Sequence, residues 1–113
     1  MTLHRFILAA ACLALGGAAT AALAQQGPVG NAEAARSKNS MCIGCHGIQG
    51  YKASFPDVYH VPKIGGQPAA YLANALKAYR SGERKHPTMH GIAASLSDQD
   101  IADLAAYYSG GGK

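Results

Sequence analysis

The feature that most constrains this chain is a run of five residues, CIGCH, at positions 42–46. Two thiols three positions apart can reach the two vinyl groups on one edge of a porphyrin, and Cys42 and Cys45 have this spacing. The imidazole of His46, directly after the second thiol, can turn onto the iron from the same side. The pattern therefore predicts one haem c attached covalently at Cys42 and Cys45, with its iron held by His46.

Three other kinds of cysteine chemistry remain open from these five residues alone. A structural disulfide suits an exported protein, but it leaves His46 without a role. A thioredoxin-like redox pair is expected in a βαβ context, and the sequence has no strand pattern. A zinc site needs further cysteines or closely paired histidines, and the spacing of His60, His86 and His90 is not of that kind.

The N-terminal residues have the pattern of an export signal. Charged residues precede an apolar run, and a small-x-small pattern at residues 22–24 precedes the expected cleavage point. We expect residues 1–24 to be removed, so that one domain, residues 25–113, reaches the periplasm with no stable membrane insertion. The alternative is an uncleaved anchor, although glycines interrupt the apolar run. Cys12 lies in this segment and lacks the context of a lipid-attachment site.

The charge pattern argues against nucleic acid as a partner. The formal net charge of the chain is +4, and the basic residues are scattered. The only local cluster, Arg80, Arg84 and Lys85, has few aromatic residues interleaved with it. Two interpretations of this cluster stay open, a docking patch for an acidic protein partner and a solvated face.

Capping and periodicity predict an all-α domain with three main helices. The first is expected over about residues 31–40, leading directly into Cys42. The second begins at Pro68 and ends at Gly82 in a left-handed cap. The third begins after Ser97, which offers a side-chain cap to a first turn rich in aspartate, and Gly110 closes it. The buried face of the third helix is expected to consist of Ile101, Leu104, Ala105 and Tyr108.

Long loops are predicted between these helices. Gly44, Gly47 and Gly50 indicate that a loop begins within the motif, and residues 51–66 show neither a helical nor an alternating period. A loop of this length in a compact domain needs something to wrap around, which favours a large ligand. Residues 83–96, interrupted by a proline, are also expected to be exposed loop.

Four segments, in this order, resemble the bacterial class I cytochromes c, particularly the small c-553 and c4-like group. They are CIGCHG at 42–47, PKIGGQ at 62–67, HPTM at 86–89 and LSDQDIADLAAYY at 96–108. The resemblance implies an all-α class I cytochrome c fold around one haem, His and Met axial ligands, and one-electron transfer between redox proteins. Two features depart from the c4 pattern: a longer aromatic segment at residues 51–59, and one CxxCH motif where c4 proteins have two such domains.

The resemblance implies Met89 as the second iron ligand. The expected mature chain has only one other methionine, Met41, which adjoins Cys42 on the tethered side. Two alternatives remain: Met89 as a flexible core residue, and the imidazole of His90 as the ligand. Adjacent side chains of an extended segment point in different directions, so Met89 and His90 cannot both face the iron.

The resemblance also implies that the Pro62 carbonyl accepts a hydrogen bond from the second ring nitrogen of His46, although Pro62 can equally be a turn residue. Other apolar residues are expected around the ring: Ile64, Leu72, Ile92, Leu96 and Leu104. Three polar residues are candidates for the haem propionates or for plain surface: Gln67, Tyr71 and Arg84.

The expected function is electron transfer and not catalysis. With His46 and Met89 both bound, the iron has no vacant position for a substrate or oxygen. We expect a monomer or weak dimer with redox proteins as donor and acceptor. Two alternatives remain: a haem enzyme or gas sensor with an open sixth position, and a subunit that works only inside a larger oxidoreductase.

Overall fold

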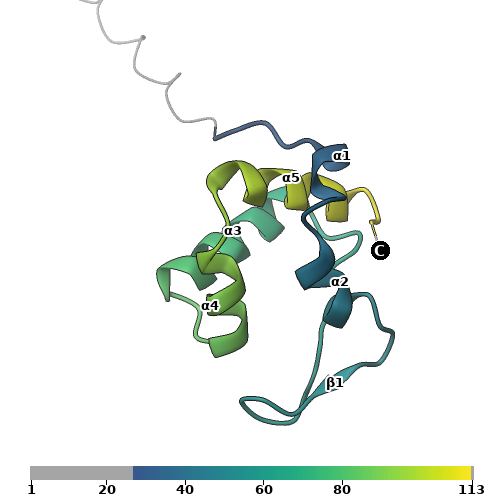
Figure 1. The fold of residues 1–113 in the computed structure, drawn as a ribbon, viewed down its shortest axis with the longest axis vertical. Helices are drawn as coiled ribbons and strands as arrows, with labels where there is room; N and C mark the ends of the chain where they lie inside the picture. The colour runs from purple at the N-terminus through teal and green to yellow at the C-terminus, as the bar shows by residue number, and fades with distance from the viewer. Residues whose placement is uncertain (1–26, 113) are drawn as a thin grey trace, which may run out of the picture.

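A computed structural model describes residues 27–112 (Figure 1). The predicted signal, residues 1–24, lies outside them. The described residues form five helices and two short strands: α1 (Ala32–Ala35), α2 (Ser40–His46), β1 (Lys52–Ala53), β2 (Tyr59–His60), α3 (Ala69–Ser81), α4 (Pro87–Ala94) and α5 (Asp98–Ser109). None of these helices is long and apolar enough to cross a membrane.

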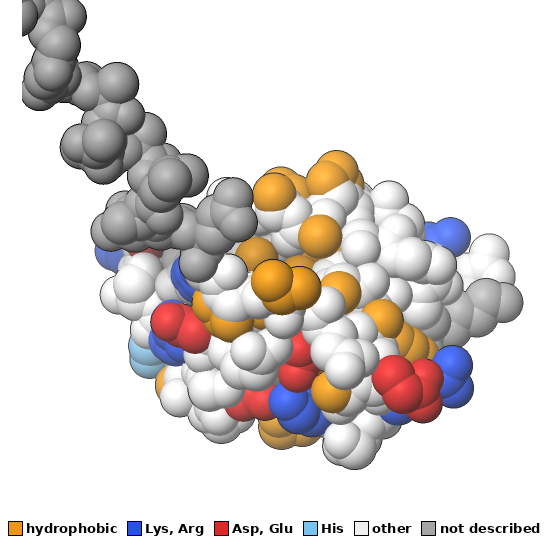
Figure 2. All heavy atoms as spheres, turned by 90° about the horizontal axis from the view of Figure 1, so that it is seen from above, with side chains coloured by type: hydrophobic (Ala, Val, Ile, Leu, Met, Phe, Trp, Pro, Cys, Tyr) orange, Lys and Arg blue, Asp and Glu red, His pale blue; other side chains and the backbone are white. Residues whose placement is uncertain are grey.

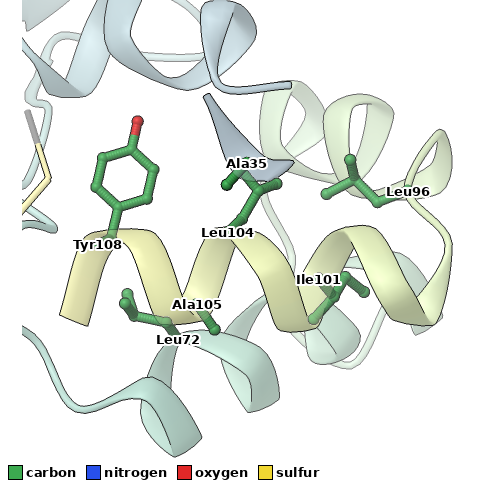
Figure 3. Close-up of a cluster of buried hydrophobic side chains, with 7 residues drawn as sticks. All are labelled: Ala35, Leu72, Leu96, Ile101, Leu104, Ala105 and Tyr108. Atoms are coloured by element: carbon green, nitrogen blue, oxygen red, sulfur yellow. The ribbon is translucent and has the colours of Figure 1, made fainter. Parts of the chain in front are cut away.

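Helix α5 is the centre of the fold, because α1 and α3 both pack against it. The Ser97 hydroxyl accepts from the Asp100 N–H and the Asp100 carboxylate accepts from the Ser97 N–H, which forms a capping box at the predicted start. The predicted buried face is confirmed, since Ile101, Leu104, Ala105 and Tyr108 are all buried. Figure 3 shows them with the three side chains that complete the core, Ala35, Leu72 and Leu96.

Helix α3 ends where predicted and begins one residue later than predicted, at Ala69. Pro68 precedes its first turn, and Gly82 ends it with a φ of 80°, a left-handed conformation that costs glycine little. Helix α4 packs against α3 beyond this turn.

The helix predicted over residues 31–40 is divided in two. Helix α1 ends at Ala35, a turn follows, and α2 then carries the whole CIGCH motif. Ser37 and Asn39 are weak helix formers because their side chains compete for backbone groups, and the Ser37 hydroxyl donates to the Ala34 carbonyl. The expectation of a loop at Gly44 was therefore wrong, because this glycine lies inside α2.

The expectation of loop over residues 83–96 was also wrong, because α4 occupies most of this segment. Pro87 is its first residue, where the missing N–H of proline costs nothing. In residues 51–61, the short strands β1 and β2 pair antiparallel, with Lys52 opposite His60 and Ala53 opposite Tyr59. This hairpin extends away from the helices in Figure 1.

The N-terminal segment is fixed to α5 by polar contacts. The buried carboxylate of Asp103 accepts from the Asn31 N–H at 2.8 Å, the Lys38 ammonium at 2.9 Å and the Gln99 amide at 2.8 Å. Gly30 passes so close to this helix that a Cβ would lie 2.1 Å from the Ala102 carbonyl oxygen. This attachment positions α1, and through the turn after it α2, beside α5.

Candidate functional site

The CIGCH motif presents its three reactive side chains to one cavity. Cys45 and His46 follow Cys42 by three and four positions on α2, one helical turn, and all three are half-buried and line the cavity. Ile43 and Gly44 are exposed and are not part of the lining. No disulfide joins the two cysteines. The helix therefore separates the reactive residues of the motif from its two spacer residues.

The ring of His46 is oriented by the main chain. Its Nδ1 lies 2.7 Å from the Pro62 carbonyl oxygen, the contact expected from the sequence. A carbonyl can only accept, so Nδ1 carries the proton and donates it. In a neutral imidazole, Nε2 then keeps its lone pair, as a metal-binding histidine requires.

The cavity has a volume of about 320 Å³, which lies in the range of roughly 300–1,000 Å³ that is usual for small-molecule sites. Helices α2, α3, α4 and α5 and the segment after β2 all contribute to its wall. Most of the wall is apolar, including Val61, Pro62, Ile64, Leu72, Ala75, Leu76, Ile92, Leu104 and Ala105. An apolar cavity with two thiols and one imidazole on the same wall fits a large apolar ring that is tethered by sulfur and ligated by nitrogen.

A buried hydroxyl at the cavity supports this fit. The Tyr108 hydroxyl makes no hydrogen bond of good geometry within residues 27–112, although it interacts with the neighbouring Cys42 thiol. Burial raises the pKa of both Tyr108 and Cys42, so both groups are held neutral. An unpaired buried donor of this kind is uncommon, and it lies on the wall of the cavity.

Met89 and His90 lie in different environments. Met89 is half-buried and lines the cavity from α4. His90 is exposed, does not line the cavity, and has its Nδ1 2.8 Å from the Tyr79 carbonyl oxygen. The two side chains do diverge, but because they are neighbours on a helix and not because the segment is extended. Met41 also reaches the cavity, from the same helix as His46.

The other expected neighbours of the ring line the cavity with one exception. Ile64, Leu72, Ile92 and Leu104 belong to the wall, and so do Gln67, Tyr71 and Arg84. The placement of Leu96 at the ring was wrong, because Leu96 is buried in the core beside Ile101 and is not part of the lining. Leu96 directly precedes Ser97, the N-cap residue of α5, and its side chain packs with the buried residues of that helix.

Sequence reasoning missed a group of aromatic residues at the cavity. His86 lines it together with Tyr59 and Tyr79, and the rings of these residues meet edge to face. The sequence did contain one signal for this group. Pro87 is as compatible with the first residue of a helix as with a loop, and a helix that begins at Pro87 has His86 as its N-cap residue. The described residues contain no group of three or more His, Cys, Asp or Glu side chains able to hold a bare metal ion.

Comparison with known proteins identifies the family of the chain. The family model for cytochrome c matches residues 32–109. Cytochrome c-554(548) of Halomonas halodenitrificans is 45% identical over 83 residues, covering 71% of this chain and 95% of that protein. The crystal structure of reduced recombinant cytochrome c4 from Pseudomonas stutzeri superposes with a TM-score of 0.50 at 34% identity, covering 77% of this chain and 54% of that one.

Other relatives are longer than the matched region. A protein named thiosulfate dehydrogenase electron acceptor, from Thiomonas intermedia, is 39% identical over 76 residues, which cover 67% of this chain and 34% of that protein. The chain likewise spans only 38% to 40% of the length of several proteins named cytochrome c4. The family model and the nearly full-length relative together show that the chain belongs to the bacterial class I c-type cytochromes, which carry a covalently attached haem c with its iron.

Proposed function

We propose that this protein is a periplasmic one-electron carrier, a monomer or weak dimer, in which Cys42 and Cys45 hold one haem c and His46 and Met89 are the axial ligands. One observation carries the proposal: a histidine oriented by the Pro62 carbonyl and a methionine on a separate helix line the same apolar cavity. Helices α2 and α4, which carry these two residues, lie apart in Figure 1.

The protein residues have separate roles in this function. When bound, haem c supplies a one-electron iron couple. His46 would offer Nε2 and Met89 its thioether to the iron, which would leave no vacant position for a substrate and so suppress substrate chemistry. The apolar wall excludes water. The covalent tether at Cys42 and Cys45 would keep the geometry of the ring constant between oxidation states, which favours fast electron exchange.

Export and partners form the second part of the proposal. Residues 1–24 act as a cleaved signal, and residues 25–113 work in the periplasm with redox proteins as donor and acceptor. The name of the Thiomonas intermedia relative supports an oxidoreductase as one of these partners.

Optical spectroscopy of the periplasmic protein tests the proposal. An alkaline pyridine spectrum reports the haem type and the number of haems per chain, and we expect one haem c. Carbon monoxide, added to the reduced protein at neutral pH, should then bind poorly, because Met89 occupies the sixth position. Prompt and tight binding would favour a gas sensor or haem enzyme instead.

A further inference from the structure

The first turn of α4 depends on an unusual capping residue. The first N–H groups of a helix have no partner within the helix, and Ser, Thr, Asp or Asn commonly supplies one. Here His86 takes that position in an extended conformation, and its Nδ1 accepts a hydrogen bond from the Met89 N–H at 3.3 Å. Met89, one of the α4 residues that line the cavity, is therefore held through its own backbone by a histidine ring.

The His86 ring is fixed on two sides by aromatic residues. The Tyr59 ring of β2 meets it edge to face at 5.0 Å and 82°, and the Tyr79 ring of α3 meets it at 6.3 Å and 75°. The Arg84 guanidinium lies 4.6 Å from the centre of the Tyr79 ring and completes the cluster. The ring that caps α4 is thus packed between the hairpin and α3.

The hydrogen bond from the Met89 N–H also defines which nitrogen of the His86 ring carries the proton. An N–H can only donate, so His86 Nδ1 must be the acceptor and the ring proton lies on Nε2. His90, one turn later, has the opposite arrangement, because its Nδ1 must donate to the Tyr79 carbonyl. Two histidines on either side of Met89 therefore tie α4 to the end of α3.

We propose that His86 is a positioning residue that sets the direction of Met89 toward the iron, by capping the Met89 N–H and by packing its ring between Tyr59 and Tyr79. The inference rests on the proposed ligation by Met89. Helix α4 has only eight residues, and so short a helix depends on its cap and its packing. Without the cap, the first turn loosens, and the Met89 sulfur leaves the iron more often.

The test uses the haem-loaded protein and two variants of one position. His86→Asn keeps a side-chain acceptor suited to capping, whereas His86→Phe keeps a flat ring and loses the acceptor. The readouts are the weak red-edge band of sulfur-to-iron coordination, the midpoint potential and the rate of carbon monoxide binding. We expect His86→Phe to weaken the band, lower the potential and speed carbon monoxide binding about tenfold, as for the loss of an N-cap. His86→Asn should lose clearly less than His86→Phe, because it keeps the cap and loses only the ring packing.

His60→Phe is the matched control, because His60 is exposed on β2 and does not line the cavity. Unchanged readouts in His86→Phe, or equal losses in His86→Asn and His86→Phe, would overturn the capping role. If His86→Phe gives no haem-loaded protein, His86→Ser and His86→Ala replace it, because Ser can cap the helix and Ala cannot. Equal spectra and equal rates of carbon monoxide binding in these two variants would overturn the proposal.

Met89→Ala separates the ligation by Met89 from the positioning role of His86. A red-edge band that survives in Met89→Ala refutes the ligation. A band that is lost in Met89→Ala and kept in His86→Phe refutes only the positioning role.

Discussion

Met89 and His90 are adjacent in sequence, yet the structure gives them different neighbours. The thioether lies at the cavity, while the imidazole is held outside it by the Tyr79 carbonyl. We therefore expect Met89→Ala to abolish the red-edge band, lower the potential and open the iron to carbon monoxide. His90→Ala should leave the band and the potential nearly unchanged.

Absorption spectra, redox titration and carbon monoxide binding of the two variants make the comparison. The opposite pattern, with losses in His90→Ala and none in Met89→Ala, would assign the sixth ligand to His90. It would also favour a low-potential bis-histidine site over the proposed carrier.

Asp103 is the one buried charged residue among the described residues, and its partners explain why it is tolerated. The Asn31 N–H, Lys38 and Gln99 all donate to its carboxylate and hold its pKa below the ordinary value of 3.8. A carboxyl group with a lowered pKa stabilises the fold above that ordinary value, and this stabilisation is lost as pH falls toward the folded-state pKa. The free energy of unfolding should therefore fall below about pH 4.

Asp103→Asn should reduce stability at neutral pH and flatten the acid limb of the pH profile, because Asn keeps the shape and loses the charge. Denaturant titrations of the haem-loaded protein at pH 7 and pH 3 measure both effects. The same loss of stability between these pH values in the variant and the wild type would contradict the role of Asp103. Asp98 and Asp100, whose pKa values are also lowered, would then account for the acid sensitivity.

Helices α3 and α5 could be predicted from the sequence because local chemistry marks both of their ends. Pro68, Gly82 and Ser97 act through backbone geometry and nearby hydrogen bonds, which a sequence displays directly. Apolar stripes between these residues indicate the buried faces. No distant contact is needed to recognise either helix.

Helices α2 and α4 could not be predicted in the same way, because both contain residues of weak helix propensity. Gly44 in α2 and Gly91 in α4 each disfavour a helix by about 1 kcal/mol relative to alanine. Helix α4 is held by its contact with α3 and by the rings of His86 and His90. The hydrophobic periodicity of the sequence does not indicate these two positions. The haem motif was recognisable by its spacing, whereas the aromatic cluster around His86 depends on tertiary structure.

The capping box of α5 gives a prediction at this scale. Ser97→Ala removes the acceptor for the Asp100 N–H and should lower the free energy of unfolding by about 1 kcal/mol. Ser109→Ala is the matched control, since its hydroxyl donates only to the Ala106 carbonyl one turn earlier, at the other end of the helix. Equal melting temperatures for the two variants would show that the cap contributes nothing to stability.

Several charged side chains of the molecule pair with one another. On the face seen from above, acidic and basic side chains are interspersed (Figure 2), and Lys38 pairs with Asp100 and Asp103. Arg80 pairs with Asp98 and also donates to the Leu96 carbonyl, so it has a structural role inside the basic cluster noted in the sequence. The docking hypothesis therefore rests on Arg84, at the cavity, and on exposed Lys85.

If these two residues dock an acidic redox partner, the bimolecular electron-transfer rate should fall as salt is raised. Lys85→Glu should slow the reaction more than Lys77→Glu, because Lys85 lies between two residues that line the cavity, Arg84 and His86, whereas Lys77 lies on α3. Stopped-flow kinetics over a range of ionic strength provide the measurement. A rate that does not depend on salt would leave Arg84 and Lys85 as solvated surface.

The core and the cavity share residues, which ties the haem to the stability of the whole molecule. Leu72, Leu104, Ala105 and Tyr108 belong to the hydrophobic core and also line the cavity. A domain of this size buries a small core, so the ring contributes a large part of it. We therefore expect the haem-free chain to be largely unfolded.

The most direct test of the account is acid–acetone extraction of the protein purified from the periplasm. Covalent attachment at Cys42 and Cys45 does not depend on the fold, so the haem should stay with the denatured polypeptide. In Cys42→Ala and Cys45→Ala, the yield of haem-loaded protein should fall sharply. Quantitative passage of the haem into the organic phase from the wild-type protein would contradict the central claim.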